Sequence, residues 1–73
     1  QNEVRSRVLA HDWAVQFHGF YVDTEAKEMR FDVVMSFDIP AREGLDILQE
    51  EMRRAYPDYR ITIAPDVDVS VTE

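Results

Sequence analysis

The stretch RITIAPDVDVSVTE, residues 60–73, alternates strictly between apolar side chains and small or polar ones. Its odd positions from Ile61 to Val71 are apolar, and its even positions include the carboxylates Asp66 and Asp68. Such alternation predicts a β-strand with one buried face. Two like charges two residues apart on the polar face indicate either protection of an exposed sheet edge or a site for a cation.

A helix is predicted directly before this strand. Pro40 suits the first turn of a helix, where its missing N–H is not needed, and Pro57 ends the pattern. Between them, apolar side chains recur at the three- and four-residue spacing of a buried helical stripe. These residues are Leu45, Leu48, Met52 and Ala55.

Two further strands are predicted in the first half of the chain, WAVQFHGFYV (13–22) and MRFDVVMSFD (29–38). The short polar link DTEAKE (23–28) makes them a hairpin. Alternation places the odd positions of both strands on the core face, and His18, Phe20, Val22 and Val34 on the other. The residues expected in the core are Trp13, Val15, Phe17, Tyr21, Met29, Phe31, Val33, Met35 and Phe37.

A short helix is predicted at the start of the chain, where NEVRSRVLA (2–10) carries Val4, Val8 and Leu9 on one face. The order is therefore helix, strand, strand, helix, strand. A right-handed crossover through the second helix makes the last two strands parallel neighbours, with strand order 1-2-3. We expect an α+β open sandwich of the ferredoxin-like type, with a three-stranded mixed sheet and both helices on one face. The other face is left open and is a candidate dimer interface.

The composition indicates one small acidic domain spanning residues 1–73. The formal net charge of −7 argues against a nucleic-acid partner, because phosphate binding needs a basic face. There is no cysteine, so neither a disulfide nor a thiolate metal site can stabilise so small a core, and oligomerisation is the remaining common means. The chain opens on Gln1 within the first helical pattern, and we interpret it as part of a longer protein.

The residues that could bind a metal lie near strand starts or on the open face. Imidazole nitrogen and carboxylate oxygen together suit zinc, manganese, iron, cobalt or nickel. The candidates are His11, His18, Asp32, Asp66 and Asp68. Each has a plain structural alternative. His11 would be a helix-terminal histidine bonded to a backbone carbonyl, Asp66 would cap a bend after Pro65, and the others would be solvated polar-face side chains. No motif for a nucleophile, a zinc protease or a phosphate loop occurs, so we expect a protein that is not an enzyme.

The stretches LAHDWAVQFHG (9–19) and EEMRRAYPDYRITIAPDVD (50–68) resemble the C-terminal cytoplasmic domain of cation diffusion facilitator transporters. In that family a His-Asp pair opens the first strand, a glycine follows about seven residues later, and the last strand runs into an acidic residue. The resemblance implies that His11 is the strand-opening histidine, Asp32 a second-strand carboxylate and Asp66 the acidic residue of the last strand. Ala64 and Val34 stand where many members carry histidines, and His18 and Asp68 are candidate substitutes.

The resemblance also implies a function. Such domains form homodimers and sense divalent cations near the dimer interface, zinc foremost, at the cytoplasmic face of the cell membrane. Their other partner is the membrane-embedded transport domain of the same chain. Two alternatives remain open at this point: a small ferredoxin-like interaction domain that dimerises without metal, and a hydrolase of the acylphosphatase type. The latter needs an arginine-and-asparagine site, and the sole asparagine is Asn2.

Overall fold

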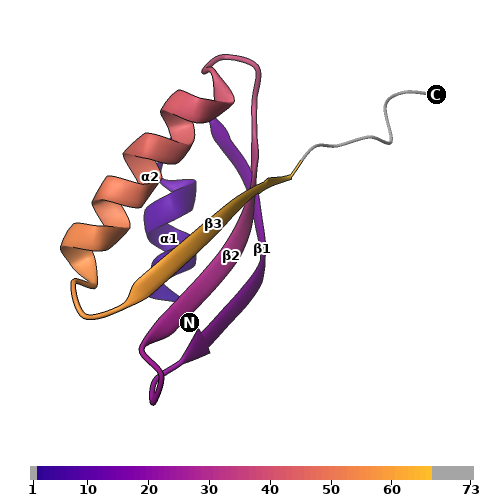
Figure 1. The fold of residues 1–73 in the computed structure, drawn as a ribbon. Coiled ribbons are helices and arrows are strands. Elements are labelled where there is room, and N and C mark those ends of the chain that lie inside the picture. The colour runs from indigo at the N-terminus through magenta and orange to yellow at the C-terminus, as the bar shows by residue number, and fades with distance from the viewer. Residues whose placement is uncertain (1, 67–73) are drawn as a thin grey trace.

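Two helices cover one face of a three-stranded sheet (Figure 1). The computed structural model describes residues 2–66. Both helices lie on the same side of the sheet, and within the described residues no element covers the other side. The elements, in chain order, are α1 (Glu3–Leu9), β1 (Ala14–Asp23), β2 (Glu28–Met35), α2 (Ala41–Ala55) and β3 (Arg60–Asp66).

The sheet has the strand order β1-β2-β3. β1 pairs antiparallel with β2 through the hairpin, and β3 pairs parallel with β2 after the crossover through α2. The predicted topology and the α+β open sandwich are therefore confirmed. β3 is described as far as Asp66, and the expected continuation of the last strand, including Asp68, lies outside the described residues.

Both helices begin and end where local chemistry favours it. The Asn2 side chain caps α1, because its Oδ1 accepts hydrogen bonds from the backbone N–H of Val4 at 2.9 Å and of Arg5 at 3.2 Å. Pro40 occupies the cap position of α2, one residue before the first helical residue, with a φ of −59° that suits helix entry. Glu43 in the first turn of α2 and two arginines in its last turn complement the helix dipole.

The core lies between the helices and the middle strand. Phe31 and Val33 of β2 are fully buried, as are Val8 of α1 and Leu48 and Met52 of α2. These side chains come from three different elements, so one core joins the layer of helices to the sheet. The predicted inner face of β2 is confirmed from Met29 to Val33. Of the predicted stripe of α2, Leu45, Leu48 and Met52 are confirmed, whereas Ala55 lies outside the core cluster.

The prediction for β1 was wrong at two of its core positions. Val15 and Tyr21 were expected inside, yet each is more than half exposed. Phe20 was expected on the open face, yet it packs against the core, with its ring 5.9 Å from that of Phe17. Phe17 keeps its predicted place and contacts the Phe31 ring at 5.0 Å.

Two β-bulges cause this change of phase. The register shifts between Ala14 and Gln16, which leaves Val15 without a partner of its own, and shifts again between His18 and Tyr21. At the second bulge, Gly19 and Phe20 together oppose a single residue of β2, and Gly19 has a φ of +70°. An extra residue on one strand reverses the alternation beyond it, and glycine takes this left-handed conformation without strain.

Phe37 was also expected in the core, and the structure places it in full solvent. β2 ends at Met35, after which Ser36 and Asp38 form a turn: the Ser36 hydroxyl donates to the Asp38 carboxylate at 3.1 Å and accepts from the Asp38 N–H at 3.2 Å. The alternation of the strand therefore does not extend to Phe37. Trp13, from the same prediction, packs at the edge of the core.

Candidate metal site

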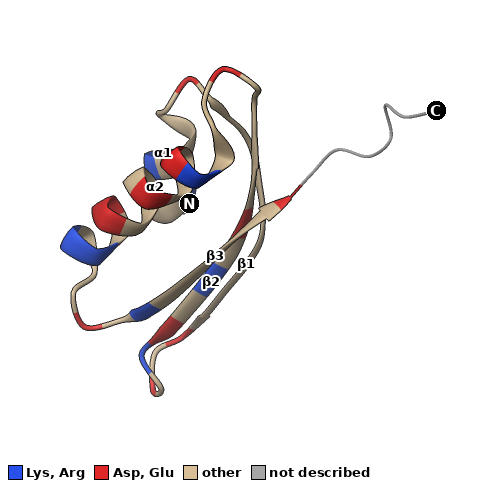
Figure 2. Ribbon diagram, turned by 45° about the horizontal axis from the view of Figure 1, so that its top comes forward, with Lys and Arg blue, Asp and Glu red and all other residues tan. Residues whose placement is uncertain are grey.

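The face of the sheet opposite the helices carries charges of both signs. Figure 2 shows acidic and basic segments on the strands as well as on the helices. Because directly paired residues of neighbouring strands share a face, the register places His18, Asp32 and Ala64 in one row across this open face. Asp66 lies one alternate position beyond Ala64 on β3, opposite Val34.

His18, Asp32 and Asp66 form a cluster in which one ligand atom from each lies within 4.8 Å of the others. The His18 Nε2 is 3.5 Å from an Asp66 carboxylate oxygen. The three side chains come from three different strands, so the register of the whole sheet fixes their approach. Among the described residues, no other group of three histidines or acids comes together in this way.

Two small residues beside the cluster leave room for the Asp32 carboxylate. A methyl group added to Gly19 would lie 2.7 Å from Asp32 Oδ2, which is closer than van der Waals contact permits. Ala64 is the direct partner of Asp32 on β3, so only a methyl group lies beside Asp32 on that strand. The bulge at Gly19 therefore shapes the site as well as the strand.

The cluster is accessible to solvent. The side chains of His18 and Asp66 are 46% and 45% exposed, and that of Asp32 is 29% exposed. The site offers one imidazole nitrogen and two carboxylates, a donor set that zinc and the other divalent transition metals accept. With a neutral histidine it carries two negative charges, which a divalent cation would balance. Water or a further protein group could complete the coordination from the exposed side.

His11 lies apart from this cluster. Its Nε2 is 2.7 Å from a Glu51 carboxylate oxygen on α2, and its ring stacks on Trp13 with centroids 4.6 Å apart. The structure thus brings together three of the five candidate ligands, places His11 against the second helix, and does not describe Asp68. The expected bond from His11 to a backbone carbonyl is replaced by the pairing with Glu51.

The sequence prediction missed Glu51 and Arg30. Glu51 lies beside the buried stripe of α2, between Leu48 and Met52. This position indicates that its carboxylate can reach a polar side chain packed against the helix, such as that of His11. Arg30 lies two residues before Asp32 on the same face of β2, and its Nη2 is 3.6 Å from Asp32 Oδ1. Spacing by two on a strand was the signal for this second contact.

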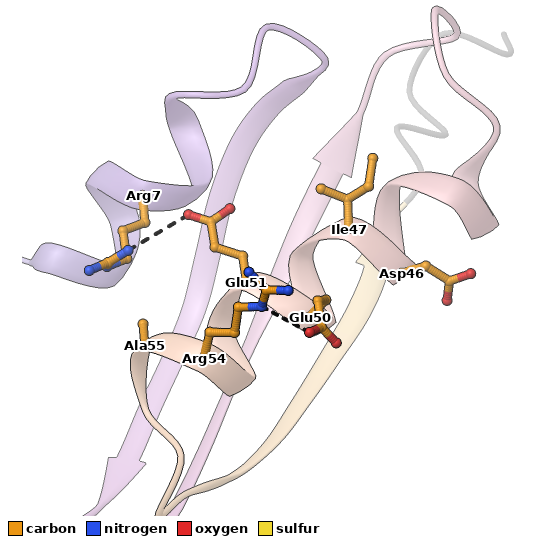
Figure 3. Close-up of a pocket in the computed structure, with 7 residues that line it drawn as sticks. All are labelled: Arg7, Asp46, Ile47, Glu50, Glu51, Arg54 and Ala55. Carbon is orange, nitrogen blue, oxygen red and sulfur yellow. Dashed lines mark hydrogen bonds and ion pairs between the residues drawn. The ribbon is translucent and has the colours of Figure 1, made fainter.

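Residues of α1 and α2 line a groove away from the metal-site cluster (Figure 3). Its volume is about 760 Å³, and four of its charged groups form ion pairs: Arg7 with Glu51 at 3.9 Å and Arg54 with Glu50 at 3.0 Å. Hydrogen bonds from Arg53 and Arg54 hold the pKa of Glu50 below its ordinary value. The groove is lined by Arg7, Asp46, Ile47, Glu50, Glu51, Arg54 and Ala55, a set without a hydroxyl, thiol or imidazole nucleophile.

Comparison with known proteins gives a match of fold. No family model matches the sequence, and no curated protein matches it either. The solved structure of CzrB, described as a candidate zinc transporter, superposes with a TM-score of 0.71 at 18% sequence identity. The alignment covers 89% of this chain and 88% of that chain. The resemblance to a metal-transporter domain that the sequence suggested is thus confirmed as a resemblance of fold.

None of the helices described here is both long and apolar enough to cross a lipid bilayer.

Proposed function

We propose that this chain is the dimerising, divalent-cation-sensing domain of a metal efflux transporter of the cation diffusion facilitator type. The observation that carries the proposal is the cluster of His18, Asp32 and Asp66, built by three strands of a fold shared with CzrB. The cation would be zinc or a related transition metal. Asp68 is a further candidate ligand, and in this proposal His11 supports the packing of α2 through Glu51.

The mechanism follows from charge. Two copies of an acidic domain repel each other when their open faces approach, and a cation held between them offsets this repulsion. Three ligands from one chain leave at least one coordination position for a water or for the second copy. A metal that gains a ligand from the second copy binds the closed pair more tightly than the separate domains. It therefore shifts the population toward the closed pair.

The rest of the proposal concerns the protein's setting. The domain would act at the cytoplasmic face of the cell membrane, attached to a membrane-embedded transport domain of the same chain. It would bind no nucleic acid and catalyse no reaction. Closing of the domain pair would then favour transport when the metal concentration rises.

A second function is favoured by the exposed apolar side chains of the sheet. Val15 and Tyr21 are each more than half exposed. Tyr21 pairs with Arg30 and so lies on the open face of the sheet. Exposed apolar residues suit a protein interface, so the domain could dimerise through the open face without metal. This alternative predicts a dimer whose affinity is the same with and without zinc.

Sedimentation velocity with zinc and with a chelator separates these functions. We expect zinc to increase the dimer fraction of the wild type, and Asp66→Asn to remove that response. The matched control is Asp46→Asn, which removes the same charge from the exposed surface of α2. An unchanged zinc response in Asp66→Asn, or an equal loss in Asp46→Asn, would show that the cluster is not the sensor.

A further inference from the structure

Arg30 is the basic side chain in contact with the metal-site cluster. Its Nη2 lies 3.6 Å from Asp32 Oδ1, and more than half of the side chain (56%) is exposed, so its guanidinium has a path into solvent. Arg30 pairs with Thr62 on β3 and with Tyr21 on β1. On the open face, this row of residues is next to the row that holds Asp32.

The other arginines in ion pairs of the described chain contact glutamates. Arg7 pairs with Glu3 and Glu51, and Arg53 and Arg54 pair with Glu50, all on the helices. Arg60 shares the sheet with Arg30, but it pairs with Glu28 at 3.3 Å, at the opposite end of β2 from the cluster. Arg30 is therefore the one arginine in these pairs that neutralises a proposed metal ligand.

We propose that Arg30 is an internal counter-cation that competes with the metal for Asp32 and sets the metal concentration at which the site fills. The inference rests on the proposed function, because it concerns the same cluster. A guanidinium stays protonated throughout the range in which proteins are folded. Unlike a histidine, it cannot yield to the metal by losing its charge, so it repels the metal unless the side chain swings away from the carboxylate.

The size of this competition can be estimated from distances. With Arg30 in place at 3.6 Å from Asp32 Oδ1, a metal on that oxygen would lie at most about 6 Å from the guanidinium, given metal–oxygen bonds of about 2.2 Å. At that separation in water, with physiological salt, the repulsion between charges of +2 and +1 weakens binding about three- to tenfold. Movement of the arginine into solvent lowers the effect toward the smaller figure.

The experiment measures the zinc dissociation constant by calorimetry for the wild type, Arg30→Gln and Arg60→Gln. Both substitutions remove one positive charge from the same face of the sheet, but Arg60 does not contact the cluster. We expect Arg30→Gln to bind zinc about three- to tenfold more tightly, with a smaller gain at 1 M salt, and Arg60→Gln to stay within about twofold of the wild type. Thermal unfolding without metal checks that each variant is folded.

The outcomes separate the inference from the proposed function. Equal zinc affinity in the wild type and Arg30→Gln would overturn the competition while leaving the metal site intact. An equal gain in Arg60→Gln would also overturn it, because the effect would then come from net charge. Absence of zinc binding in all three folded proteins would overturn the metal site and the role of Arg30 together.

Discussion

Substitution of Gly19 by alanine tests whether the bulge in β1 and the Asp32 carboxylate depend on each other. The substitution has two costs. Alanine at a φ of +70° costs about 1–2 kcal/mol in the left-handed region. The added methyl group would also lie 2.7 Å from Asp32 Oδ2, and moving that carboxylate adds a coupling of about 1 kcal/mol, within the usual range for residues in contact.

The two costs separate in a double-mutant cycle with Asp32→Ala. In the wild-type background, Gly19→Ala should destabilise the fold by about 2–3 kcal/mol, which lowers the midpoint temperature by roughly 10–20 °C in a domain of this size. In the Asp32→Ala background the methyl group meets no carboxylate, so about 1–2 kcal/mol of backbone cost should remain. Urea unfolding followed by the fluorescence of Trp13, the single tryptophan, measures all four proteins without metal.

Two results would refute this reasoning. If Gly19→Ala leaves the stability unchanged, the bulge does not hold the backbone as the structure shows. If the cost is the same in both backgrounds, the methyl group and the carboxylate do not meet, and the shape assigned to the site is wrong.

Two predictions concern the rest of the fold. Phe31→Ala should cost about 3–5 kcal/mol of stability because the ring is fully buried. Phe37→Ala should change stability by less than about 0.5 kcal/mol because the ring is in solvent. Urea unfolding of both variants checks this, and similar costs would contradict the placement of Phe37 beyond the end of β2. The pKa of Glu50 is held below its ordinary value by Arg53 and then Arg54, so these ion pairs support the fold above the pKa of an unfolded glutamate and are lost as the pH falls through the folded pKa. A carboxyl NMR titration should show that low pKa, and Arg53→Gln should raise it toward the ordinary value; no rise would refute the pairing.

Much of the fold could be predicted because two segments have unbroken periodicity. The alternation of β2 and the stripe of α2 each continue over a whole element, and together they fix the parallel pairing of β2 with β3. β1 was predicted only in part, because a bulge inserts a residue without changing the apparent alternation of the sequence. The glycine at position 19 was the available signal, since a glycine inside a strand often marks a bulge.

The candidate site was predictable to a similar extent. Asp32 and Asp66 could be placed together from the expected adjacency of their strands, and His18 joins them through direct pairing with Asp32. The position of His11 could not be predicted, because it lies in the turn between α1 and β1, where no periodicity fixes the direction of a side chain. Its partner Glu51 is 40 residues away in the sequence.

The most direct test of the metal site is a zinc titration followed by the imidazole NMR signals of the two histidines. Zinc should shift the His18 ring nitrogens to saturation and leave those of His11 in place, because His18 lies in the cluster and His11 is bonded to Glu51. Asp66→Asn should weaken the His18 response, since it removes one of the three ligands. Saturable shifts at His11 with none at His18, or no saturable shift at either ring, would contradict the site proposed for this domain.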